Sequence, residues 1–137
     1  MPRAETWVIG LAWALAAVNL AAAGGKLLDL HGFVALLAEY RLAPAALLMP
    51  MAVLVVALEI LAGIGLLVLG WRRRAALVAA ALATVNGIVL SVTLLRGIQL
   101  ANCGCFGVYL ARPLTILSPL EDVALLVAAL LVARRSA

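Results

Sequence analysis

Four long apolar runs, separated by short polar segments, dominate this chain. A helix needs about 20 mostly apolar residues to cross a bilayer, and the first three runs reach that length. The last run, Leu120 to Ala133, is short by itself, so we extend it back to residue 114, with Pro119 as a helix start or a kink. The pattern predicts an all-α integral membrane protein, a four-transmembrane-helix bundle in one domain of residues 1–137, with spans at about 7–28, 45–70, 75–95 and 114–133.

The connector at residues 30–43 is less apolar and has a helical period of its own. Phe33, Leu36, Leu37 and Tyr40 fall at positions i, i+3, i+4 and i+7. This spacing is typical of an amphipathic helix that lies along a membrane surface. We therefore predict a short interfacial helix in the first outer loop, where it covers one end of the bundle.

Small residues recur at helical spacing in two of the runs, where they would let neighbouring helices approach closely. We expect both stripes to face other helices. They are Gly10, Ala14, Ala17, Ala21 and Gly25 in the first run, and Ala79, Ala83, Gly87 and Ser91 in the third.

Composition supports a membrane location. Of the 137 residues 68% are hydrophobic and 12% are charged, and the mean hydropathy is +1.25. Soluble domains have about half apolar and about a quarter charged residues. The net charge is +4, but the chain has no basic patch interleaved with aromatic residues of the kind that binds nucleic acid. We therefore expect a lipid bilayer and no nucleic acid as the partner of the chain. The first run is longer than the apolar part of a secretory signal peptide, and we expect it to be retained.

Basic residues gather at one end of the predicted bundle. Four spans place both termini and the turn at residues 71–74 on the same side, and positively charged loops stay in the cytoplasm. The cysteine-containing segment then faces the extracytoplasmic side, with Tyr40 and Tyr109 in an aromatic belt at that boundary. The arginines on the predicted cytoplasmic side are Arg3, Arg72, Arg73, Arg74, Arg134 and Arg135.

The chain has two cysteines, Cys103 and Cys105, separated by a single glycine. Disulfides persist outside the cytoplasm, and the small ring that this pair would close departs from relaxed disulfide geometry, which makes the bond easy to reduce. We predict that the pair is redox-active. Two alternatives stay open: the cysteines are inert small side chains, or their thiolates bind Cu(I) or Zn together with His31.

Polar side chains lie at similar depth in three of the runs. Glu59 is well inside the second run, where an uncompensated carboxylate costs several kcal/mol. Asn19 and Asn86 lie at about the same depth in the first and third runs. We predict a polar layer inside the bundle, which is either a hydrogen-bonded structural clamp or part of a proton relay or a quinone contact.

Lys26 and Asp29 close the first run. The simplest interpretation pairs them at the membrane surface, with the lysine ammonium reaching toward water. The functional alternative places Lys26 near Cys103 or Cys105, where its charge would lower a thiol pKa. We expect His31 to be solvated.

The stretch Cys-Gly-Cys-Phe-Gly at 103–107, preceded by Arg96, resembles the MauE family of methylamine-utilisation proteins, a branch of DoxX-like four-span membrane proteins. The resemblance implies a bacterial inner-membrane protein that supports disulfide chemistry outside the cytoplasm, with thioredoxin-like periplasmic proteins as companions. The namesake role is maturation of the small subunit of methylamine dehydrogenase. Other residues that carry the resemblance are Lys26, Phe33, Tyr40, Pro44 and Glu59.

The chain departs from the family pattern at two places. Asn102 stands where an acidic residue often precedes the Cys-Gly-Cys, and Glu121 precedes Asp122 where a basic residue followed by Asn or Asp is common. The first departure would alter the pKa of a cysteine thiol. The second would alter a partner contact inherited from the family.

These observations predict a membrane thiol–disulfide redox protein whose Cys103 and Cys105 exchange with a thioredoxin-like partner or a substrate protein in the periplasm. A quinone is the one cofactor that we consider, although no quinone-binding motif is readable. The alternatives are a non-enzymatic assembly or scaffold protein and a thiolate metal-handling protein. The supporting residues that we predict are Lys26, Glu59, Asn19, Asn86 and Tyr40.

Overall fold

The computed structural model describes residues 3–136, with side chains from residue 6 onward, and within that range it contains helices and no strands. The all-α prediction is therefore confirmed. The elements are α1 (Arg3–Leu27), α2 (Leu30–Glu39), α3 (Ala45–Leu67), the short 3-10 helix η1 (Leu69–Trp71), α4 (Arg72–Leu95) and α5 (Leu117–Arg135).

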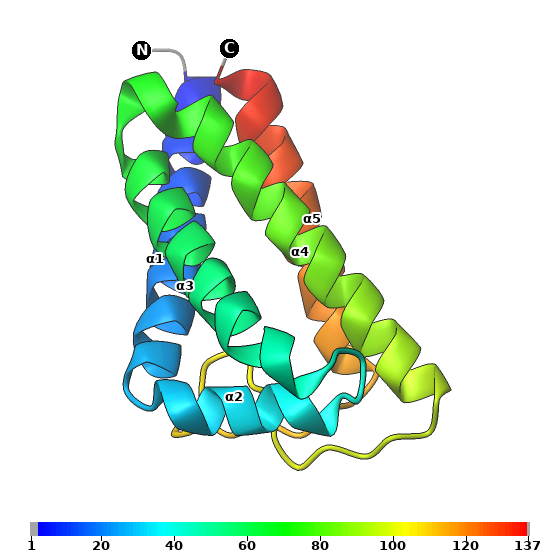
Figure 1. Ribbon diagram of the computed structural model, residues 1–137. Helices are drawn as coiled ribbons and strands as arrows, with labels where there is room; N and C mark the ends of the chain where they lie inside the picture. The colour runs from blue at the N-terminus through cyan, green and yellow to red at the C-terminus, as the bar shows by residue number, and fades with distance from the viewer. Residues whose placement is uncertain (1–2, 137) are drawn as a thin grey trace.

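The long helices form two packed pairs, α1 with α3 and α4 with α5, and α3 also packs against α4. Figure 1 shows that α2 lies across one end of this bundle, beside the long connector between α4 and α5. The start of α1, the end of α5 and the η1 turn lie together at the opposite end. The start of α1 and the end of α5 are therefore far from the cysteine-containing connector.

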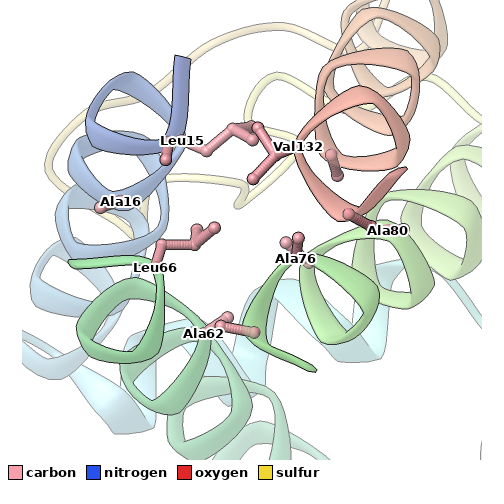
Figure 2. Close-up of a cluster of buried hydrophobic side chains, with 12 residues drawn as sticks. Leu15, Ala16, Ala62, Leu66, Ala76, Ala80 and Val132 are labelled. Atoms are coloured by element: carbon pink, nitrogen blue, oxygen red, sulfur yellow. The ribbon is translucent and has the colours of Figure 1, made fainter. Parts of the chain in front are cut away.

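A core of small side chains holds the helices together (Figure 2). Ala16 of α1, Ala62 of α3 and Ala76 of α4 are each at most 1% exposed, so the backbones of three helices approach closely around them. Leu66 and Val132, both completely buried, fill the space that these alanines leave. In hydrocarbon such close packing takes the place of the hydrophobic driving force that operates in water.

The two predicted small-residue stripes have different outcomes. On α4, Ala79 and Ala83 are buried against other helices, as predicted. On α1 the prediction was wrong, because Gly10 is exposed and an added Cβ there would meet nothing within 4 Å. The face of α1 that packs is the one that carries Ala12 and Ala16.

Three helical segments of the described chain are long and apolar enough to cross a membrane: Thr6–Leu27, Ala45–Leu67 and Leu69–Leu95. Their outward faces carry large exposed side chains such as Leu61 and Ile88, which are 65% and 58% exposed. Such surfaces suit lipid rather than water. The last predicted span is present as the 19-residue helix α5. Its crossing of the membrane stays a prediction.

Candidate functional site

The two cysteines lie in the connector between α4 and α5, at the end of the bundle that α2 covers (Figure 1). Both are free thiols, and their sulfurs are hydrogen-bonded at a Sγ–Sγ distance of 3.2 Å. Gly104 between them has φ +79°, a left-handed conformation that a residue with a side chain rarely adopts. The glycine therefore lets the chain turn sharply enough to bring the sulfurs together.

Asn102 holds this turn in shape through its side-chain amide. Its oxygen accepts hydrogen bonds from the backbone N–H groups of Gly104, at 2.9 Å, and of Arg112, at 3.4 Å. Its nitrogen donates to the carbonyl oxygens of Gly107 and Val108, at 3.2 and 3.4 Å. An aspartate at this position would keep the two acceptor contacts but lose both donors. The departure from the family pattern at Asn102 thus supplies two hydrogen bonds.

Tyr40 and Arg96 tie the cysteine turn to the rest of the bundle. The Tyr40 hydroxyl donates to the carbonyl oxygen of Cys103, and Arg96 donates to the carbonyl oxygen of Tyr40 at 2.8 Å. Tyr40 is 5% exposed, so its predicted place in an outer aromatic belt is wrong, whereas Tyr109 is 70% exposed. Burial raises the pKa of Tyr40, so the hydroxyl keeps the proton that it donates.

The turn also packs directly on the end of α1. A Cβ atom added to Gly25 would overlap the backbone carbonyl of Phe106, and one added to Gly107 would overlap the carbonyl of Gly25. Backbone lies on backbone here, and only glycine at both positions permits this approach. The contact therefore fixes the position of the cysteine turn along α1 relative to Lys26, the residue after Gly25.

Lys26 forms a buried ion pair with Glu59 of α3. Their side chains are 2% and 6% exposed, and the ammonium also lies 5.2 Å from the centroid of the Phe33 ring. The predicted pairing of Lys26 with Asp29 was wrong. Asp29 instead caps α2, where its carboxylate accepts a hydrogen bond from the N–H of Gly32 at 2.9 Å. Asp29 therefore stabilises the start of α2, while the Lys26 side chain points into the bundle toward Glu59.

Two cavities flank the cysteine turn. The larger, of about 350 Å³, has walls from α1, α4 and α5, and Cys105 lines it together with the three predicted polar-layer residues, Asn19, Glu59 and Asn86. The smaller, of about 120 Å³, lies under α2 and contains Lys26, Tyr40 and both cysteines. The structure therefore places the two cysteines and the five predicted supporting residues around these two cavities.

The polar layer is not a hydrogen-bonded clamp in the described part of the chain. The Asn19 amide donates to the carbonyl of Leu15 on its own helix at 2.9 Å, and Glu59 pairs with Lys26. The second carboxylate oxygen of Glu59 is buried without a hydrogen-bond partner. The layer thus surrounds a cavity, and one of the residues that line it keeps a buried acceptor oxygen without a partner.

The surroundings of the two thiols make them unequal. The hydrogen bond with the Cys105 side chain and the backbone amide of Cys105, helped by the charge of Arg112, lower the pKa of Cys103 to about 6, against the opposing effect of burial. The same sulfur–sulfur hydrogen bond, together with burial, raises the pKa of Cys105. At neutral pH the pair therefore holds one proton and one negative charge.

His31 is exposed on α2 and is not part of this cluster. Among the described residues, no three His, Cys, Asp or Glu side chains are close enough together to hold a metal ion. A metal site that combines His31 with the two thiolates therefore finds no geometric support.

Comparison with known sequences identifies the family of this chain. A family model described as methylamine utilisation protein MauE matches residues 4–135. The chain belongs to the MauE family. A curated relative, the methylamine utilization protein MauE of Paracoccus denitrificans, is 32% identical over 119 residues, which are 87% of this chain and 64% of the relative. The chain thus spans less than two thirds of that relative's length, and no solved structure matches it.

Sequence reasoning missed two positions of the candidate site in this MauE-family chain. Asp122, at the start of α5, is 7% exposed and lines the larger cavity, although the sequence analysis named it only beside Glu121 in a departure from the family pattern. Asn102 organises the cysteine turn, although it stood out only as a departure from the family pattern. One signal was available for Asp122: it follows Glu121 inside an otherwise apolar run, and consecutive residues on a helix point in directions about 100° apart.

Proposed function

We propose that this chain is a membrane-embedded thiol–disulfide exchange protein that supports the formation of disulfides in periplasmic proteins. The observation that carries the proposal is the pair of free thiols, 3.2 Å apart, in a turn that is held by the Tyr40 hydroxyl and by the backbone of Gly25. A cysteine with a pKa of about 6 is largely a thiolate at neutral pH, and the thiolate is the form that attacks a disulfide.

The exchange proceeds in two balanced steps. The Cys103 thiolate attacks one sulfur of a partner disulfide, which forms a mixed disulfide and releases the other partner sulfur as a thiolate. Cys105 then loses its proton and attacks Cys103, which closes the intramolecular disulfide and releases the second partner sulfur. The partner gains two electrons, and the reverse sequence delivers a disulfide to a substrate protein.

The proposed setting is the bacterial inner membrane. Three helices have the length and apolarity of spans, and α5, packed along α4, completes a bundle of four. The arginines near the η1 turn and at the end of α5 then lie in the cytoplasm, and the cysteines lie outside it. The helix α2 would lie in the outer interface, where its position across the bundle end suits an amphipathic segment.

The family relation suggests the pathway. We propose a role in methylamine utilisation of the kind that the name of the Paracoccus relative states, through maturation of a disulfide-rich subunit such as the small subunit of methylamine dehydrogenase. The partner would be a thioredoxin-like periplasmic protein or the substrate subunit itself. The buried Lys26–Glu59 pair and Tyr40 would position the cysteine turn for that exchange.

Trapping of mixed disulfides tests the exchange. In membranes that contain an oxidised thioredoxin-like protein, the Cys105→Ser variant is expected to accumulate a mixed disulfide through Cys103, because no resolving thiol remains. The double variant Cys103→Ser/Cys105→Ser is the matched control, since it keeps the size of both side chains, and it should accumulate none. Equal trapping by both variants would refute the proposal, and trapping by neither would leave a scaffold role as the better account.

A further inference from the structure

The larger cavity carries a further inference. Its volume of about 350 Å³ falls within the range of about 300–1,000 Å³ that is typical of small-molecule sites. Apolar side chains such as Leu15, Leu82 and Leu125 form most of its wall, and Cys105 of the redox pair lines the same cavity. A ligand in this cavity would be an apolar molecule in contact with a thiol.

Two unsatisfied acids give this cavity its chemical character. Glu59 and Asp122 are 4% and 7% exposed, and each has one carboxylate oxygen, Oε2 and Oδ2 respectively, that is buried without a hydrogen-bond partner. Buried polar atoms without partners are rare in native proteins and require an explanation. Both residues line the cavity, so a ligand with hydroxyl or protonated oxygen groups would satisfy them.

Asn86 supplies the complementary group. Its side chain lines the same cavity from α4 and is half-buried, and its amide nitrogen can donate to a carbonyl oxygen. The cavity therefore offers an amide donor for a carbonyl and carboxylate acceptors for a hydroxyl. A molecule that alternates between a dicarbonyl and a dihydroxy form would find a partner in either state.

We propose that this cavity binds the head group of a lipid-soluble quinone, which reoxidises the Cys103–Cys105 dithiol. The inference rests on the proposed exchange function and names the oxidant that this function needs. A quinone is flat, largely apolar and soluble in the bilayer, and its two carbonyl oxygens match the polar groups of the cavity wall.

The electrons and protons balance. The Cys103 thiolate and the Cys105 thiol lose two electrons and one proton as the Cys103–Cys105 bond forms. The quinone takes up both electrons, that proton and a second proton from water, so that its two carbonyl oxygens become the hydroxyls of the quinol. Asp122 is placed to move one of these protons, because it lines the cavity with Cys105 and its charge is near enough to raise the pKa of the Cys105 thiol. Gly87 of α4 lies next to Asp122, since an added Cβ there would be in ordinary van der Waals contact with the Asp122 Cβ at 3.4 Å.

Photolabelling tests the binding without any thiol chemistry. The Cys103→Ser/Cys105→Ser protein in lipid nanodiscs is irradiated with an azidoquinone, and the labelled peptides are identified by mass spectrometry. We expect labels on the cavity-lining segments of α4 and α5, and competition by decylubiquinone. Labels spread over outward lipid-facing positions, or labels that decylubiquinone does not displace, would overturn the inference.

Matched variants sharpen this test. Ala124→Phe places a ring at an exposed position of the cavity wall and should reduce labelling about tenfold or more, whereas Ala57→Phe, on an exposed face of α3 outside this cavity, should stay within about twofold of the parent. Asn86→Leu keeps a similar volume, removes the amide donor and should also weaken labelling. Equal labelling of Ala124→Phe and Ala57→Phe would contradict the cavity as the site.

Electron transfer is measured separately with the reduced wild-type protein. Decylubiquinone has a fully substituted ring, so thiols cannot add to it, and its loss reports reduction to the quinol. One quinol for each dithiol, abolished in the double serine variant, supports the inference. A pair that forms a reversible disulfide with glutathione but leaves decylubiquinone unreduced would overturn the quinone inference and leave the exchange function standing. A pair that forms no disulfide under any condition would overturn both.

Discussion

The ion pair between Lys26 and Glu59 joins α1 to α3 beneath the cysteine turn, and its removal gives a stability prediction with a clear magnitude. The two side chains are 2% and 6% exposed, so neither can recover contact with water when its partner is lost. Breaking one member of a buried pair typically costs about 3–5 kcal/mol, because the remaining charge stays buried. The Lys26→Met variant should therefore lose about 3–5 kcal/mol of unfolding free energy. One Glu59 oxygen already lacks a partner, and in this variant both would.

Replacement of both residues provides the matched comparison. Lys26→Met/Glu59→Leu removes both charges and keeps similar volumes, and such replacements are often neutral or stabilising. We expect the double variant to be more stable than either single variant. The exposed pair Arg112–Glu121, whose side chains are 39% and 47% exposed, is the control on the same protein, and Glu121→Gln should change stability by about 1 kcal/mol or less.

The assay is reversible unfolding in mixed detergent micelles, with the helical circular dichroism signal followed across a denaturant series. Single variants of Lys26 and Glu59 that are as stable as the parent would refute the reasoning, since they would show that water reaches the pair. A double variant that loses the sum of both single effects would also refute it, because the residues would then act independently.

Three further predictions concern the cysteine turn. The alkylation rate of Cys103 should reach a plateau above about pH 7 and should fall about tenfold per pH unit below its pKa of about 6, because the lowered pKa keeps the reactive thiolate populated down to that pH. A midpoint of the rate near the ordinary thiol pKa of about 8.5 would contradict this. Tyr40→Phe leaves the Cys103 carbonyl without its hydroxyl donor and should cost about 1–3 kcal/mol in the same unfolding assay; an unchanged stability would show that this hydrogen bond is not made. Gly25→Ala should displace the turn and speed alkylation of both thiols, because the added Cβ overlaps the Phe106 carbonyl. Gly24→Ala is the control: its added Cβ meets nothing within 4 Å, so the alkylation rate should stay unchanged. Equal rates in the two variants would count against the docking of the turn on α1.

The sequence was sufficient for the helices but not for their rotation. The apolar runs place α1, α3 and α4 correctly, because length and hydropathy alone decide whether a segment can cross a bilayer. The face of α1 was assigned wrongly, since small residues such as Gly10 cost little when they face lipid and are not confined to the packed side. The packed side became visible only once Ala12 and Ala16 were seen against the other helices.

For the site, too, the sequence predicted some features and missed others. The sequence singled out Glu59 because an acid within an apolar run is costly, and it singled out the cysteines because of their spacing. It paired Lys26 with the nearest acid along the chain, whereas the partner lies 33 residues away on another helix. The role of Asp122 depends on how α5 rotates against α4, and no periodicity in the sequence specifies that rotation.

The reduction potential of the Cys103–Cys105 pair tests the central claim most directly. The full-length protein in nanodiscs is equilibrated with glutathione or dithiothreitol buffers of known potential, and the free thiols are counted by alkylation and mass spectrometry. The account predicts one reversible two-electron transition within the range of exchange catalysts, about −270 to −120 mV. Two thiols that stay reduced at every potential would contradict it.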